Sequence, residues 1–261
     1  CSVRKLRFVL GFICVTTGYA FTFFLKHKSD SFSKIQELIE SLESNKSYPF
    51  KFDPSKLTLI SDNAKEFKSN EVDHFCKSKK ISQEFSSSYA HHENLFIERL
   101  WRTLADASRS MLAMGNVPFR FWPLAWRHAT RIYNYMPHRT RFETSASESP
   151  HYKLFRVEPD LSCFRIFGSD AYRYLEKSAR SGSKATAARA SFGLYVGHDD
   201  NLKTILVLML EREIVVASGL VKIIENVDKV GQVISNPDVS VASFEFEKYD
   251  VHMSARPNPF T

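Results

Sequence analysis

Two acidic residues, Asp62 and Glu98, stand where a carboxylate can act as a metal ligand. Asp62 directly follows the apolar segment LTLI at 57–60, Glu98 lies in a long amphipathic segment, and 35 residues separate them. Carboxylates are the ligands that Mg²⁺ prefers, and pairs of such ions promote in-line attack on phosphodiesters. In a purely structural alternative, Asp62 is a turn residue and Glu98 a solvated helix acid paired with Arg102 at i, i+4.

Histidines and cysteines give no comparable pattern. The adjacent His91 and His92 diverge in direction, so zinc binding there is only a minor alternative. The four cysteines form no C-x-x-C pair, which favours an intracellular protein over a disulfide framework or a zinc site. They are Cys1, Cys14, Cys76 and Cys163.

The chain is basic, with a formal net charge of +7 over 261 residues. Such a charge suits a phosphate-rich partner, because lysines and arginines that neutralise phosphates release counterions. The same charge is compatible with binding to an anionic membrane surface, or with a basic protein that has no such partner. The charge alone therefore does not distinguish these possibilities. A hydrophobic fraction of 43% and an aromatic fraction of 13% are typical of a globular protein.

Residues 8–25, FVLGFICVTTGYAFTFFL, are almost uncharged and follow three basic residues. This resembles a signal peptide or a single membrane span. However, Thr16-Thr17-Gly18 divides the segment into two halves of strand length, both rich in β-branched and aromatic residues. We therefore predict two buried neighbouring strands joined by a turn, with a membrane anchor as the alternative.

The elements that must position the two acids alternate between strands and helices. After the strand pair, the hydrophobic spacing predicts helices at 31–44, 70–79, 94–114 and about 118–135, and strands at 57–60 and 81–85. This order predicts a mixed sheet covered by helices. The segment FRFWPLAWRHATRIYNY at 119–135 is interpreted as core packing rather than as a surface on which nucleic-acid bases stack.

The composition changes after Pro137. We predict a core over 1–140, a linker over 141–160 with at most a short helix near 151–155, and a small β-barrel over 161–224. The strand signals of this barrel are CFRIF, AYRYL, SFGLYV, KTILVLML and REIVVAS. The signal fades beyond residue 225, so 225–261 is expected to be a tail without regular structure.

Around the two acids the chain carries longer motifs. The residues Ser61-Asp62-Asn63-Ala64-Lys65-Glu66-Phe67 are similar to S-D-N-G-x-E-F. Part of Y-x-P-Q-Q-N-G-x-x-E-R-x-N-R-T-L is matched by Tyr89, Asn94, Glu98, Arg99, Arg102, Thr103 and Leu104. Further matching segments are FLKHKSD, ASRSML, FWPLAW, PDLSCFRIFGSDAYRYL and GLYVGHDDN. From about residue 6 to 224 the chain thus resembles the integrases of copia-type long-terminal-repeat retrotransposons.

The resemblance implies an α/β ribonuclease-H-like core followed by an SH3-like barrel, cut from a Pol polyprotein. Asp62 and Glu98 would ligate Mg²⁺ or Mn²⁺ and catalyse phosphodiester cleavage and strand transfer during DNA integration. The residues expected to contact DNA phosphates are Asn63, Asn94, Arg99 and Arg102. The implied partners are element ends, target DNA and further copies of the chain in the nucleus, with no small-molecule cofactor and no membrane.

The match fails at the third metal ligand of this family, an Asp on the first strand of the core. No Asp precedes Asp30 here, so we expect that this strand either lies upstream of Cys1 or has been lost. Its absence from this chain would leave an exposed sheet edge. Ala64 and Leu95 also replace family glycines, and Leu95 would forbid a positive φ if the site needed one. We therefore expect an integrase fragment with little or no strand transfer. The first alternative is a non-catalytic nucleic-acid-binding remnant or a domesticated element protein. The second is a protein anchored in a membrane by residues 8–25.

Overall fold

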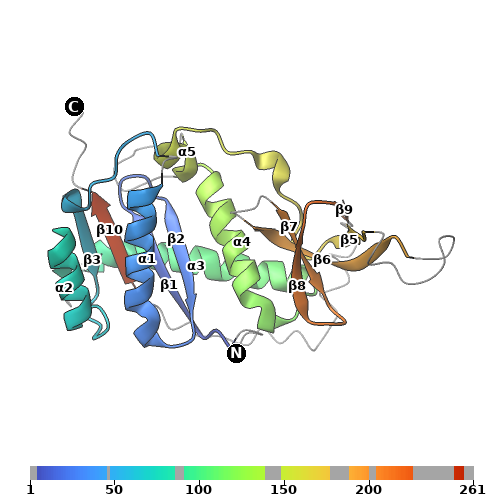
Figure 1. Cartoon of the computed structure of the whole chain (residues 1–261), viewed down its shortest axis with the longest axis horizontal. Coiled ribbons are helices and arrows are strands. Elements are labelled where there is room, and N and C mark those ends of the chain that lie inside the picture. Colours follow the sequence, from blue (N-terminus) through green and yellow to red (C-terminus); the bar gives the residue numbers. More distant parts are fainter. Residues whose placement is uncertain are drawn as a thin grey trace.

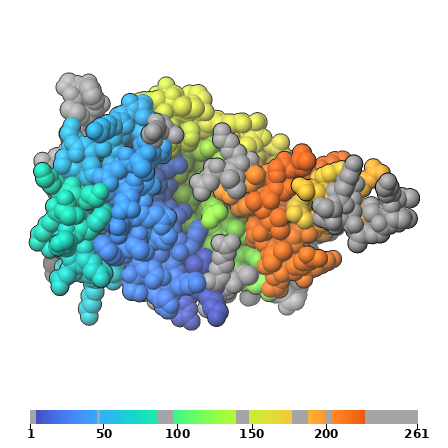
Figure 2. All heavy atoms as spheres, in the orientation of Figure 1, coloured from blue at the N-terminus to red at the C-terminus, as the bar shows by residue number. Residues whose placement is uncertain are grey.

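The structure is a computed structural model that describes residues 5–45, 48–85, 91–138, 148–176, 188–199, 204–225 and 250–255; over 91–96 and 250–255 it describes the backbone alone. Two five-stranded sheets lie at opposite ends of the molecule, with helix α4 between them (Figure 1). Figure 2 shows one continuous surface in which the helices bridge the two sheets.

The first sheet contains the almost uncharged segment near the N-terminus. Strand β1 (Phe8–Cys14) pairs with β2 (Ala20–Leu25) in an antiparallel hairpin whose register runs from Phe8↔Leu25 to Ile13↔Ala20. The prediction of two strands joined by a turn is therefore confirmed. In the part of the chain that the structure describes, no helix is long and apolar enough to cross a membrane.

The other half of this sheet holds β3 (Leu57–Ser61) and β4 (Ser82–Phe85), which run parallel. Between the two halves lies β10 (Asp250–Ala255), parallel to β1 and antiparallel to β3, giving the order β2-β1-β10-β3-β4. The expectation of an exposed sheet edge between these two halves is wrong. Strand β10 pairs with β1 on one side and with β3 on the other, so the backbone groups of both strands are hydrogen-bonded there. The expectation of a structureless tail is also wrong for 250–255, whereas 226–249 and 256–261 lie outside the described residues.

Alternating residues of β1 face two different cores. Leu10 and Phe12 pack against the helices α1 and α2, whereas Val9 and Ile13 pack against α3 on the opposite face. The helices on the first face are α1 (Ser31–Ser44) and α2 (Asn70–Lys79), preceded by the 3₁₀ turns η1 (Lys28–Asp30) and η2 (Pro54–Lys56). The predicted helices at 31–44 and 70–79 are confirmed.

Helix α3 (His91–Met114) crosses the opposite face of the sheet. Its stripe of Ile97, Trp101, Leu104 and Ser108 is buried as predicted, and Met111 is partly buried. Trp101 rests on Gly11 of β1, where a Cβ atom would lie only 2.9 Å from Cζ2 of the indole. After the turn η3 (Phe119–Phe121), α4 (Trp122–Tyr135) packs against α3.

The second sheet is antiparallel, in the order β8-β7-β6-β5-β9. It consists of β5 (Asp170–Tyr174), β6 (Ala190–Asp199), β7 (Thr204–Met209), β8 (Ile214–Ser218) and β9 (Val221–Ile224), and it follows helix α5 (Pro150–Phe155). The prediction of a strand at CFRIF is wrong. There, Asp160 accepts hydrogen bonds from the backbone and hydroxyl of Ser162 and starts the 3₁₀ turn η4 (Leu161–Cys163).

One hydrophobic cluster joins the second sheet to the helices. Leu194 and Leu208 of this sheet belong to the same buried cluster as Trp101 of α3 and Trp126 of α4. The chain segments predicted as a core and a barrel therefore bury apolar surface against each other. The predicted boundary near residue 140 falls on 139–147, outside the described residues.

Candidate metal and nucleic-acid site

Asp62 is the first residue after β3, and its side chain is half-buried. Its Oδ1 atom accepts a hydrogen bond from the backbone N–H of Ala64 at 3.1 Å, which holds the carboxylate in a local turn. Burial raises the pKa of Asp62 above its ordinary value, the Ala64 hydrogen bond opposes this, and the nearby charge of Glu66 adds to the rise. A cation beside this carboxylate would therefore relieve an unfavourable charge.

Glu98 lies on α3 and is also half-buried. The helix follows β4 in the chain, packs against β10, and reaches β1 where Trp101 covers Gly11. Glu98 therefore lies one turn before this contact, on the stretch of α3 that approaches from the β3 side. Helix α3 thus carries Glu98 over the same sheet at whose strand end Asp62 lies.

The structure does not join the two acids directly. Among the described residues, no hydrogen bond links Asp62 to Glu98, and the carboxylate that acts on the pKa of Asp62 belongs to Glu66. No group of three or more His, Cys, Asp or Glu side chains suited to a metal ion occurs where side chains are described. The salt bridge between Glu98 and Arg102 in the structural alternative is likewise not formed.

The four residues predicted to contact DNA phosphates lie close in sequence to Asp62 or Glu98. Asn63 is exposed next to Asp62, and Arg99 and Arg102 are exposed on α3. Asn94 lies near the start of the same helix, where only the backbone is described, as do His91 and His92. Two exposed basic side chains therefore follow Glu98 on α3, one and four residues further along the helix.

The two substituted glycine positions do not strain the backbone. Leu95 lies within α3, and neither Leu95 nor Ala64 has a positive φ. The condition attached to Leu95, a positive φ at this position, is therefore not met in this fold. An alanine or leucine is as compatible with these conformations as a glycine.

A divalent cation fits the two acids in ligand chemistry. Both offer hard carboxylate oxygens, and Mg²⁺ is commonly held by one or two carboxylates, with water and substrate phosphates completing its shell. Asp62 and Glu98 would hold the ion, and the ion would stabilise charge that develops on a phosphodiester. Within the described side chains, no third acid completes the cluster.

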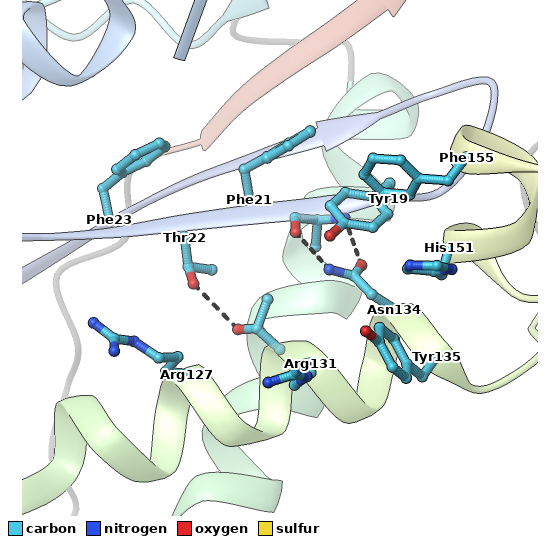
Figure 3. A pocket seen from close by; sticks show the side chains of 12 residues that line it. Tyr19, Phe21, Thr22, Phe23, Arg127, Arg131, Asn134, Tyr135, His151 and Phe155 are labelled. Carbon is cyan, nitrogen blue, oxygen red and sulfur yellow. Dashed lines mark hydrogen bonds between the residues drawn. The ribbon is translucent and has the colours of Figure 1, made fainter. Parts of the chain in front are cut away.

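A second feature, which the sequence analysis did not predict, is a pocket between β2, α4 and α5. Arg127, Arg131 and Tyr135 of α4 line it together with His151 of α5 (Figure 3). The interpretation of 119–135 as core packing holds for Trp122 and Trp126, which are buried. The spacing of the arginines at i and i+4, followed by a tyrosine at i+8, was the available signal, because these positions share one helix face.

No family model matches the sequence. The chain is 27% identical over 180 residues to the retrovirus-related Pol polyprotein from transposon TNT 1-94 of Nicotiana tabacum, covering 69% of this chain and 13% of the relative. It is 25% identical over 194 residues to that from transposon RE2 of Arabidopsis thaliana, covering 73% and 12%. The chain thus spans about one eighth of the length of these relatives.

Solved structures similar to this chain include the catalytic core domain of BIV integrase, with a TM-score of 0.40 and 17% identity over 55% of this chain and 82% of that one. The HTLV-2 integrase catalytic core domain in complex with magnesium has a TM-score of 0.37 and 17% identity, over 53% and 78%. The sequence comparisons agree with the resemblance that the motifs indicate. The chain is homologous to a segment of the retrovirus-related Pol polyproteins of plant copia-type transposons.

Proposed function

We propose that the chain is the core of an integrase-type polynucleotidyl transferase that binds DNA and transfers strands weakly or not at all. Asp62 and Glu98 are its ligands for Mg²⁺ or Mn²⁺. The observation that supports this is that Asp62 follows directly on β3, while Glu98 lies on α3, which packs against β10 of the same sheet. Integrase chemistry needs carboxylates on rigid elements in this way, because the ions must be held against the phosphodiester.

The weakness of the reaction follows from the number of ligands. Two-metal catalysis needs several carboxylates to hold both ions, and the described side chains offer no cluster of three. One ion held by two acids keeps most of its ligands as water, so it binds loosely and positions substrate poorly. DNA binding requires only the phosphate contacts, for which we propose Asn63, Asn94, Arg99 and Arg102.

The test combines a strand-transfer assay with a direct measurement of metal binding. We expect no strand transfer above background in Mg²⁺ or Mn²⁺, and weak Mn²⁺ binding by isothermal titration calorimetry that Asp62→Asn or Glu98→Gln abolishes. Asp106→Asn serves as the matched control, because this acid is exposed on the same helix and should leave Mn²⁺ binding unchanged. Robust strand transfer that Asp62→Ala abolishes would refute weak activity, and unchanged Mn²⁺ binding in Asp62→Asn and Glu98→Gln would refute the ligand assignment.

A second candidate is a nucleic-acid binder without any metal chemistry, which the net charge of +7 and the exposed Arg99 and Arg102 favour. Its affinity would fall steeply with salt, as counterion release requires, yet would be indifferent to metal and to Glu98→Ala. An Mg²⁺-dependent gain in DNA affinity, lost in Glu98→Ala, would contradict it.

We also propose that the second sheet is the SH3-like unit implied by the family resemblance. The strands β5 to β8 pair in succession and β9 returns to β5, which leaves β8 and β9 at the two edges. A register shift in β6 between Tyr195 and His198 marks the irregularity at which a strand can bend around a small barrel. Such a unit would supply further contacts to DNA or to another copy of the chain.

A further inference from the structure

The contact between α4 and the second sheet encloses one histidine. His128 of α4 is 3% exposed, and aromatic rings surround it on the side of the second sheet. Its ring centroid lies 5.7 Å from those of Phe164 and Phe167 and 5.6 Å from that of Tyr195. Figure 1 shows α4 beside the strands of this sheet. The imidazole therefore lies where the helices and the second sheet meet.

One ring nitrogen of His128 connects α4 to the second sheet. The ring forms a hydrogen bond with the backbone of Arg165 that favours the protonated ring, so the ring is the donor. Arg165 belongs to the segment 164–169, which is attached to β6. There, Gly168 donates to the carbonyl of Tyr195, and Tyr195 donates to the carbonyl of Ser169, each at 2.8 Å. The hydrogen bond of His128 thus runs from α4 to a segment that is held by the second sheet.

The other ring nitrogen, Nδ1, is buried without a hydrogen-bond partner among the described residues. It faces the backbone at Gly197, where an added Cβ atom would lie 3.4 Å from it. Since the bond to Arg165 uses Nε2, Nδ1 is the atom that a further proton would occupy. In the closed contact this new N–H would have no acceptor. A buried donor that carries charge and has no acceptor is strongly unfavourable.

The groups around His128 do not compensate a positive charge on its ring. Burial is the main cause that lowers the pKa of His128, and His198 and Arg131 lower it further, whereas no described Asp or Glu acts on it. His198 is held on β6, with its Nδ1 atom 3.0 Å from the hydroxyl oxygen of Tyr195. The titratable and charged groups that face this region are His198 and Tyr195 of β6, Arg131 of α4, and Cys163 and Arg165 before β5.

The second sheet can separate from α4 without the loss of a strand ladder. In the described part of the chain, its strands pair only with one another. The hydrophobic cluster that joins it to the helices shares no residue with the cluster between α1, α2 and the first sheet. Helix α4 is attached to the first sheet independently, because the Asn134 side chain forms hydrogen bonds with the N–H and the carbonyl of Ala20, each at 2.8 Å. An opening at His128 therefore leaves α4 and the first sheet together.

We propose that the contact between α4 and the second sheet is sensitive to acid and opens when His128 is protonated at Nδ1. The second sheet and the segment 164–169 then move away from α4, and the imidazolium reaches water. The open state remains a minor one, since the hydrophobic cluster still favours the closed contact, but acid raises its population. The inference does not depend on the metal chemistry proposed above.

The size of the effect follows from the titration of His128 in the two states. In the open state the ring titrates near its ordinary pKa of 6.5, and in the closed state burial lowers this pKa to about 4. The stabilisation of the closed contact is complete above pH 6.5 and is lost as the pH falls toward 4. Between pH 7.5 and pH 5, the equilibrium constant for opening should therefore rise about 30-fold.

Peptide-resolved hydrogen exchange of the full chain, at pH 7.5 and pH 5 with and without low urea, tests this. Protection factors are compared, because they are corrected for the effect of pH on the chemical exchange rate. We expect protection in β6 and β7 to fall about 30-fold at pH 5. Exchange there should depend less on urea than in β1 and β3, because the opening exposes less surface than complete unfolding.

Two variants assign the effect to one imidazole. His128→Phe keeps a ring that cannot be protonated, so the fall of protection in β6 and β7 should shrink to less than about threefold. His74→Gln is the matched control, because His74 is exposed on α2 and its loss should leave the 30-fold fall unchanged.

Two results would overturn the proposal. One is a fall of protection in His128→Phe as large as in the unaltered chain. The other is the same urea dependence in β6 and β7 as in β1 and β3 at pH 5, because the sheets would then open only together. If His128→Phe does not fold, the pH profile of the unaltered chain decides. Protection in β6 should begin to fall near pH 6.5, and a fall confined to pH values below 4 contradicts the proposal.

Discussion

At the scale of single residues, His128 shows how the contact between α4 and the second sheet controls a titratable group. Its side chain is 3% exposed, and its ring centroid lies 5.7 Å from that of Phe167 and 5.6 Å from that of Tyr195. Burial, aided by the charges of His198 and Arg131, lowers the pKa of His128 to about 4. The imidazole is therefore neutral in the folded protein over the physiological pH range.

This burial predicts a loss of stability in mild acid. An unfolded histidine titrates near its ordinary pKa of about 6.5, so between that pH and about 4 only the unfolded state takes up the proton. The stabilising contribution is complete above pH 6.5 and declines by roughly 3 kcal/mol as the pH falls through this window. Urea unfolding at pH 7.5 and pH 4.5 measures it, and His128→Phe should flatten the dependence. The exposed His74, changed to Gln, is the control and should leave the pH dependence as it is.

At the scale of elements, a pair of glycines lets the end of α3 touch the chain that enters the second sheet. Gly168 has φ +84°, and a Cβ atom there would lie 2.3 Å from the Cα atom of Gly115. A Cβ atom on Gly115 would lie 2.7 Å from the carbonyl oxygen of Phe167. Both clashes are with backbone atoms, which cannot rotate away as a side chain can.

Gly168→Ala should therefore destabilise the protein strongly. It combines a positive φ with a backbone clash, and we expect the free energy of unfolding to fall by about 3 kcal/mol or more. Gly219→Ala is the matched control, because no atom lies within 4 Å of the added Cβ and the change should be nearly neutral. The midpoints of urea denaturation compare the two, and equal midpoints would show that the close approach has no energetic importance.

At the scale of the whole molecule, β10 connects parts of the chain that are distant in sequence. Its register pairs Gly11 with Asp250 and Ser61 with Val251, so strands near both ends of the described chain share one sheet. Without β10, the β1–β2 and β3–β4 pairs would each present an open ladder to solvent. The backbone of 250–255 therefore completes the sheet at whose strand end Asp62 lies.

Met253→Pro tests this arrangement in the full chain. Met253 pairs with Cys14 and Leu59 in the centre of the sheet, and proline there removes a ladder donor. We expect faster amide hydrogen exchange in β1 and β3 and a loss of roughly 1–3 kcal/mol of stability. A chain ending at residue 249 should lose more, and one ending at residue 255 should behave like the full chain. If all three chains exchange at the same rate, β10 does not complete the sheet.

The sequence by itself determined the elements whose signals are local. The alternating halves of residues 8–25 and the helical spacing of Ile35, Leu38, Ile39 and Leu42 produced β1, β2 and α1, because burial periodicity is encoded within a few residues. The motifs around Asp62 and Glu98 are also local, since each consists of residues close together in the chain, and they were sufficient to predict the homology to Pol polyproteins that the comparisons show. The roles of these two acids stay predictions.

The features that combine segments distant in sequence, namely the central strand β10 and the pocket beside β2, were apparent only from the tertiary structure. The residues 250–255, DVHMSA, carry no strong strand signal, and they form β10 because β1 and β3 offer unpaired ladders on both sides. The pocket combines residues from Tyr19 to Phe155, and no local pattern contains such a combination. Long-range pairing and packing decide these features, since their free energy comes from partners that are absent from the local sequence.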